Sequence, residues 1–138
     1  MIKKLTQQLI FPVSLMFTAA LTLSGCANTT AGVGASSSGQ TRIDSNSLSR
    51  DVKIEQIISR RLGDLLQGTA VLVSQGAYDV QLQYKFTWFD LDGISVDDEG
   101  NSWKSLTLHG HENKHIQALA PNPMASSFEI YVRKSHSN

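Results

Sequence analysis

This sequence has no excess of charge of either sign. Lysine and arginine together number 12 among the 138 residues, and aspartate and glutamate also number 12, so the formal net charge is zero. Proteins that bind nucleic acid normally carry an excess of basic residues that neutralises the phosphates. We therefore expect no nucleic-acid partner.

Cysteine is nearly absent, and so are the motifs of nucleophilic enzymes. Cys26 is the single cysteine, so no internal disulfide can form. Catalysis by serine requires an oriented base beside it, and neither G-x-S-x-G nor S-x-x-K occurs in the chain. Asp97 and Asp98 are adjacent carboxylates, but in a loop such a pair is more commonly solvated charge than a glycosidase centre. We expect a protein that is not an enzyme and carries no cofactor.

What is present indicates one folded domain behind an export signal. Hydrophobic residues make up 41% of the chain and charged residues 17%, which is the balance of a globule rather than of a disordered tail. Lys3 and Lys4 precede an apolar stretch, residues 9–23, that is interrupted by Pro12. This stretch is shorter than the roughly 20 residues of a membrane-spanning helix. Residues 1–25 are therefore predicted to be a signal peptide.

The signal ends in Leu23, Ser24, Gly25 and Cys26, which closely resembles the lipobox of bacterial lipoproteins. In those proteins the cysteine thiol receives a diacylglyceryl group, the peptide is cut just before the cysteine, and the new amine is acylated. One acyl chain holds a protein only marginally, whereas two or more anchor it stably. Ala27 follows the cysteine, and the resemblance implies a lipid anchor in the outer membrane that faces the periplasm.

Residues 26–47 are predicted to be the lipidated cysteine and a flexible tether, because Gly, Ser, Thr and Asn dominate and apolar side chains are few. About 20 such residues have an r.m.s. reach of roughly 25 Å. The folded domain is then expected to occupy residues 48–138.

Two segments, residues 80–88 and 128–133, alternate apolar and polar residues with the period of two that a half-buried strand produces. A large inward-facing aromatic set is more often core than a ligand platform. Residues 69–75 and 104–109 are predicted to be further strands. We therefore predict an all-β fold, a small immunoglobulin-like β-sandwich. The inward residues are Val80, Leu82, Tyr84, Phe86 and Trp88 in one segment and Phe128, Ile130 and Val132 in the other, where Glu129, Tyr131 and Arg133 face outward.

Residues 50–66 allow two interpretations. Six apolar residues follow helical spacing, and Ser49 is available as an N-cap. Two strands divided near Gly63 are favoured, because a small sandwich needs about seven strands and the rest of the chain supplies fewer. The six residues are Ile54, Ile57, Ile58, Leu62, Leu65 and Leu66.

The acidic segment after residue 89 resembles a calcium loop only in part. Asp90, Asp92, Gly93 and Glu99 fall at the third, fifth, sixth and twelfth places of an EF-hand loop, but Trp88 takes the first place, where an oxygen ligand belongs. A hairpin turn at Asp92 and Gly93 with a solvated acidic loop after it fits the sequence better.

Three histidines lie close together in the sequence: His109, His111 and His115. The first two flank Gly110 between two predicted strands, so we expect them at a turn, and His115 falls in the next strand. Only Glu112 lies close by and no cysteine is available. A polar turn is therefore favoured over a transition-metal site.

Several motifs resemble one family. YKFTWFDLDG at residues 84–93, Trp103, and APNPMASSFEIYVR at residues 120–133 are similar to the YcfL family of small enterobacterial lipoproteins. That family has a similar aromatic strand, an Asp-x-x-Gly turn and an Ala-Pro segment before the last strand. The resemblance implies an all-β, immunoglobulin-like lipoprotein domain without an established activity. It is often encoded beside an LpoB-type lipoprotein activator of peptidoglycan synthases.

Two functions of different classes remain open. The first is a non-catalytic module that binds a periplasmic or outer-membrane protein, of the peptidoglycan synthesis or outer-membrane machinery, through outward apolar residues such as Phe89 and Tyr131. The second is a binder of a small ligand or a transition metal that uses His109, His111 and His115. The first is the preferred hypothesis.

Overall fold

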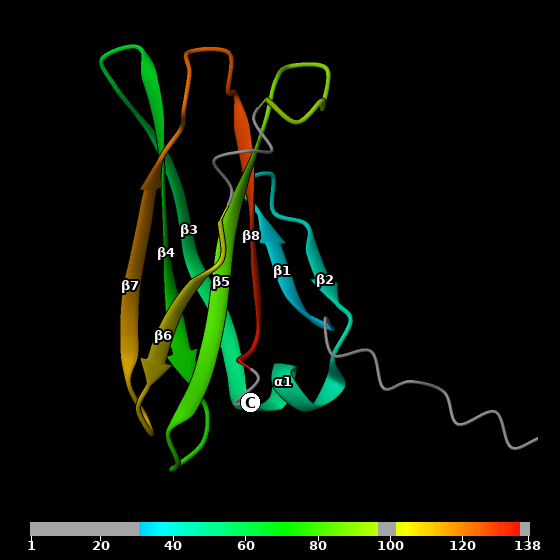
Figure 1. Ribbon diagram of the computed structural model, residues 1–138, viewed down its shortest axis with the longest axis vertical. Helices are drawn as coiled ribbons and strands as arrows, with labels where there is room; N and C mark the ends of the chain where they lie inside the picture. The colour runs from blue at the N-terminus through cyan, green and yellow to red at the C-terminus, as the bar shows by residue number, and fades with distance from the viewer. Residues whose placement is uncertain (1–30, 97–101, 136–138) are drawn as a thin grey trace, which may run out of the picture.

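Two antiparallel sheets pack face to face in a computed structural model that describes residues 31–96 and 102–135 (Figure 1). The predicted all-β sandwich is confirmed. The larger sheet has the strand order β2 (Thr41–Ile43), β1 (Gly32–Ser36), β8 (Ser127–Lys134), β5 (Val80–Phe89) and β6 (Lys104–Leu108). The smaller sheet has the order β3 (Val52–Leu62), β4 (Leu65–Ser74) and β7 (Asn113–Leu119), and a short helix, α1 (Asn46–Asp51), precedes β3.

The core lies between the sheets and contains large side chains from both. Phe128, Ile130 and Val132 of β8 are fully buried, as the alternating pattern predicts. Phe86 and Trp88 of β5 are also buried, and their rings stack with centroids 5.9 Å apart. A buried aromatic pair of this kind contributes about 0.5–1.5 kcal/mol beyond the area that it removes from water. The inward aromatic side chains of β5 therefore belong to the core.

Of residues 50–66, for which the sequence leaves a helix and two strands open, only residues 50 and 51 are helical, as the end of α1, and the rest form two strands joined by a turn. β3 ends at Leu62 and β4 begins at Leu65. Gly63 lies in the turn between them with a φ of 60°, a conformation that glycine adopts without steric cost. The favoured interpretation is confirmed.

The helical spacing of the isoleucines in β3 has a physical cause in the strand. The register with β4 shifts between Glu55 and Ile58, where the strand bulges. A bulge places an extra residue in one strand and so changes which side chains share a face. Ile54 and Ile57, three positions apart, both pack against the core, whereas Ile58 is 56% exposed.

The folded part begins earlier than predicted. The tether expected over residues 26–47 is wrong from residue 31 onward, because β1 is hydrogen-bonded between β2 and β8 and the domain does not begin at residue 48. Val33 and Ala35 of β1 are buried in the core. The first strand of the chain thus pairs with the last one, β8, inside the larger sheet.

The glycines that suggested flexibility serve close packing. Gly32 and Gly34 face the outer side of the sheet, where the Tyr131 ring lies against β1. A Cβ atom added to Gly34 would lie 3.0 Å from Cδ2 of Tyr131 and 2.8 Å from a carboxylate oxygen of Glu129. Only glycine leaves room for these two side chains.

The two ends of the sandwich carry different loops (Figure 1). At the α1 end, the carbonyl of Gly32 accepts hydrogen bonds from the backbone N–H groups of Asp44 and Ser45, which directly precede the helix. The β4–β5 loop and the β6–β7 turn lie at this end too. The β3–β4 turn, residues 90–96 after β5 and the β7–β8 connection lie at the opposite end.

Several predicted features lie outside the described residues: the signal peptide at residues 1–25, Cys26, and the acidic residues Asp97, Asp98 and Glu99. Within the described ranges, no helix is long and apolar enough to cross a membrane.

Candidate binding groove on the outer face of the larger sheet

A row of large side chains crosses the outer face of the larger sheet. Arg42 of β2 pairs with Gly34 of β1, Gly34 pairs with Tyr131 of β8, and Tyr131 pairs with Lys85 of β5. Because side chains alternate along each strand, paired residues share a face. Trp103, directly before β6, extends the row at its other end and approaches Lys85.

Tyr131 is central to this row but is not exposed as predicted. Only 9% of the residue is accessible, because the ring lies over the glycines of β1 and beneath neighbouring side chains. The guanidinium carbon of Arg42 lies 4.6 Å from the ring centroid, and the hydroxyl donates a hydrogen bond of 2.6 Å to Asp44. Burial and then the hydrogen bond to Asp44 raise the pKa of Tyr131, so the phenol stays protonated.

Trp103 gathers two cations around its ring. The guanidinium carbon of Arg133 lies 3.8 Å from the ring centroid, and the ammonium nitrogen of Lys85 lies 5.2 Å from it. Tyr131 approaches the same ring edge-on, with centroids 6.2 Å apart. Cations within about 6 Å of an indole are attracted by its quadrupole, so the three side chains hold Trp103 in place.

These side chains border an open groove of about 470 Å³ on the sheet surface. Phe89, which is half-buried, lines the groove together with Tyr131. The groove therefore contains both aromatic residues that the sequence analysis proposed for an interaction surface. The sequence reasoning assigned no binding role to Arg42, Lys85, Trp103 or Arg133. For Lys85 and Arg133, the alternating pattern of β5 and β8 already placed the side chain on the outer face of the sheet, and this was the signal that could have identified them. The lining residues are Arg42, Lys85, Thr87, Phe89, Trp103, Glu129, Tyr131 and Arg133.

The charges of the groove are divided unevenly. Arg42 forms ion pairs with Asp44 at 3.1 Å and with Glu129 at 3.6 Å. Lys85 and Arg133 form no ion pair with any carboxylate in residues 31–96 and 102–135. The side of the groove that holds Trp103 is therefore the cationic side.

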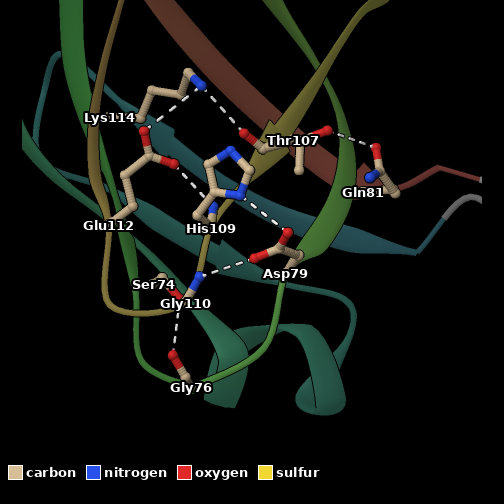
Figure 2. A network of polar contacts seen from close by, with 9 residues as sticks. All are labelled: Ser74, Gly76, Asp79, Gln81, Thr107, His109, Gly110, Glu112 and Lys114. Atoms are coloured by element: carbon tan, nitrogen blue, oxygen red, sulfur yellow. Dashed lines mark hydrogen bonds and ion pairs between the residues drawn. The ribbon is translucent and has the colours of Figure 1, made fainter.

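The predicted polar turn around the histidines is confirmed at the α1 end (Figure 2). A ring nitrogen of His109, Nδ1, lies 2.9 Å from a carboxylate oxygen of Asp79 in the neighbouring loop. The backbone N–H groups of His109 and Gly110 donate to Glu112 at 2.8 Å and to Asp79 at 3.3 Å. Lys114 lies 3.6 Å from Glu112 and donates to the carbonyl of Thr107 (Figure 2). All of these contacts join the β6–β7 turn to itself, to the β4–β5 loop or to the adjacent strands, so they stabilise the turn.

The two carboxylates that accept hydrogen bonds from this turn, those of Asp79 and Glu112, are held in the charged form. The hydrogen bond with His109 is the main cause that lowers the pKa of Asp79, and the backbone N–H of Gly110 adds to it. The backbone N–H of His109 is the main cause that lowers the pKa of Glu112. Both shifts follow from hydrogen bonds that favour the ionised carboxylate.

The three histidines do not form a common ligand set in this structure. His111 lies in the turn with a φ of 57°, and His115 is exposed in β7 opposite Val71 of β4. Among the described residues, no group of three or more His, Cys, Asp or Glu side chains is placed to hold a metal ion.

The aspartates after β5 make a turn, as the sequence predicts. A carboxylate oxygen of Asp90 accepts hydrogen bonds of 2.9 Å from the backbone N–H groups of Asp92 and Ile94. Gly93 has a φ of 79°. The Asp90 carboxylate therefore stabilises the turn that follows it.

Comparisons with known proteins support the fold. A family model described as "Protein of unknown function (DUF1425)" matches residues 39–134. The crystal structure of a DUF1425 family member from Shewanella sp. pv-4 is 41% identical in sequence, with a TM-score of 0.59 over 78% of this chain and 99% of that one. The crystal structure of Campylobacter jejuni cj0090 is 24% identical, with a TM-score of 0.56 over 66% of this chain and 93% of that one, and it supports the fold alone. No curated protein matches the chain.

Proposed function

The chain belongs to the DUF1425 family, and from this premise we propose that it is a YcfL-type lipoprotein acting as a non-catalytic protein-interaction module. Lipid on Cys26 anchors it in the outer membrane, and the sandwich faces the periplasm. Its partner is an envelope protein of the peptidoglycan synthesis or outer-membrane machinery. The outer face of the larger sheet is the surface that binds this partner.

The observation that carries this proposal is the composition of the groove. Trp, Tyr and Arg are the residue types that dominate binding energy at protein interfaces, and the groove contains Trp103, Tyr131 and two arginines beside Phe89. Cation–π contacts and the packing over β1 hold several of these side chains in fixed positions. A surface that is ordered before binding loses less conformational entropy when a partner arrives.

Because the folded domain begins close to Cys26 in the chain, the lipid anchor restricts how the domain is oriented relative to the membrane. Cys26 and Ala31, the first described residue, are five residues apart, and five residues span at most roughly 18 Å. Since Gly32 lies at the α1 end, a lipid at Cys26 keeps that end near the headgroups. The groove then stands on the side of the sandwich, accessible to a partner in the periplasm.

The anchor is tested with Cys26→Ser. We expect the wild-type chain to be cut before Cys26, to carry the mass of its acyl chains and to fractionate with the outer membrane. The variant is expected to stay uncut or to become soluble. If the variant keeps the mature mass and still fractionates with the outer membrane, the anchor is wrong.

The interaction is tested by chemical crosslinking in cells followed by mass spectrometry. We expect one reproducible envelope protein to be captured by the wild-type chain and lost with Phe89→Ser. Ile58→Ser is the matched control, because Ile58 is an exposed apolar residue on the smaller sheet. Capture that is unchanged by Phe89→Ser, or lost equally with Ile58→Ser, contradicts a role for the groove.

A further inference from the structure

We infer that the cationic side of the groove binds a carboxylate on an acidic peptide segment of the partner protein. This inference rests on the proposed function and names the chemistry of its partner. Lys85 and Arg133 are the two residues that would make the contact, and Trp103 positions both of them.

Arg133 is already arranged to accept a carboxylate. Its Nε donates a hydrogen bond of 3.1 Å to the side-chain oxygen of Gln83, and one face of the guanidinium lies over Trp103 at 3.8 Å. The two terminal nitrogens are the donors that a carboxylate engages in a bidentate pair. Within the described residues they have no carboxylate partner.

Lys85 adds a second positive charge beside the same ring. Its ammonium nitrogen lies 5.2 Å from the Trp103 centroid, so both cations lie beside one ring and attract the acidic side chains of a single peptide segment. On the opposite side of the groove, Arg42 is already neutralised by Asp44 and Glu129. An acidic residue therefore fits the Trp103 side, and an apolar residue next to it fits against Phe89.

Other ligand classes fit these features less well. A sugar ring would stack on an open indole face, but Arg133 covers one face of Trp103. A phosphate-rich surface such as nucleic acid or an anionic membrane attracts proteins through a broad excess of positive charge, and this chain has a formal net charge of zero. Two cations confined to one groove suit a short acidic segment.

The two tryptophans make the inference measurable. Trp88 is buried in the core, whereas Trp103 lies in the groove. In an NMR titration of the processed, detergent-solubilised protein labelled with ¹⁵N-tryptophan, the indole N–H of Trp103 reports binding, and that of Trp88 reports the integrity of the core. The probes are a capped hexapeptide of alternating glutamate and leucine, the same peptide with glutamine in place of glutamate, sodium acetate and inorganic phosphate.

We expect the glutamate peptide to shift the Trp103 signal saturably and to leave the Trp88 signal in place. Loss of one charge-assisted pair weakens binding by about tenfold or more, which is the effect expected for Arg133→Gln, with a smaller loss for Lys85→Gln. Lys53→Gln, an exposed lysine of β3 on the other sheet, is the matched control and should have no effect. Higher salt should weaken binding.

Three results would overturn the inference. The glutamine peptide could bind as well as the glutamate peptide, Arg133→Gln could bind with unchanged affinity while its Trp88 signal shows an intact core, or acetate and phosphate could saturate the site as tightly as the peptide. Each of these leaves the proposed function standing if Phe89→Ser still abolishes capture of a partner in cells. Loss of that capture effect, in contrast, counts against the proposed function itself.

Discussion

The guanidinium carbon of Arg133 lies 3.8 Å from the centre of the Trp103 ring, although β5 separates β8 from β6 in the sheet. The two side chains meet above the strand that lies between them. Arg133 also donates to Gln83 of that strand at 3.1 Å. The contact therefore ties three strands together on the outer face and fixes the shape of the groove.

This contact is expected to contribute measurable stability. In a double-mutant cycle of Trp103→Leu and Arg133→Gln, we expect a coupling free energy of about 0.5–1 kcal/mol, the size typical of a cation–π pair at an exposed site. Urea unfolding of the four proteins measures it. Free energies of unfolding that add within about 0.3 kcal/mol would show that the pair is not coupled.

Gly68 of β4 is a further position where packing requires glycine. A Cβ atom there would lie 2.8 Å from two ring carbons of Phe128, which is fully buried. Overfilling a core in this way costs about 1–3 kcal/mol, so Gly68→Ala should lower the free energy of unfolding by that amount. Gly76→Ala is the control, because no atom lies within 4 Å of its added Cβ. Equal stability of the two variants would contradict the described packing.

The role of β1 in the fold can be tested at Val33. This side chain is 5% exposed in the core, so Val33→Ala should reduce the free energy of unfolding by about 1–3 kcal/mol. Thr41→Ala, at an exposed position of β2, should change it by less than about 0.5 kcal/mol. Chemical denaturation distinguishes the outcomes. If Val33→Ala is as stable as the wild type, residues 31–36 behave as the tether that the composition suggests.

Acid is expected to destabilise the turn at the α1 end. Hydrogen bonds lower the pKa of Asp79 from its ordinary value of 3.8 and that of Glu112 from 4.5. A carboxyl with a lowered folded-state pKa contributes stability that is complete above the ordinary value and is lost as the pH falls through the lowered one. Thermal unfolding of Asp79→Asn should therefore show a smaller loss of stability than the wild type between about pH 5 and pH 2.

A His109→Ala background provides the control for this pH effect, because the hydrogen bond with His109 is the main cause of the lowered pKa of Asp79. In a His109→Ala background the carboxyl of Asp79 has lost its main hydrogen-bond partner, so Asp79→Asn should then alter the pH profile much less. An equally large change in both backgrounds would mean that His109 is not the cause.

The strands were predictable where one face of the sheet is buried and the other is wet. Phe128, Ile130 and Val132 alternate with Glu129, Tyr131 and Arg133 because one face of β8 lies against the core along the strand, and the period of two follows directly. The same reasoning is ambiguous in β3, because the bulge between Glu55 and Ile58 breaks the period.

The start of the domain and the groove were not predictable in the same way. The composition around Gly32 and Gly34 suggests a flexible segment. The reason for glycine at these positions is the Tyr131 ring that lies over β1, which only the structure shows. Likewise, Trp103 and Arg133 lie 30 positions apart in the chain and meet only because β5 brings β6 and β8 to its two sides. Contacts of this kind depend on strand order, which a local sequence pattern does not contain.

Site-specific photocrosslinking in cells tests the binding face most directly. A photoreactive phenylalanine analogue replaces Thr87 in the groove, and in a second strain it replaces Gln117, an exposed residue of β7 on the smaller sheet. We predict a discrete crosslinked band to one envelope protein from position 87 that Arg133→Gln weakens, and no such band from position 117. A band from position 117 with none from position 87 would contradict the assignment of the larger sheet as the binding surface.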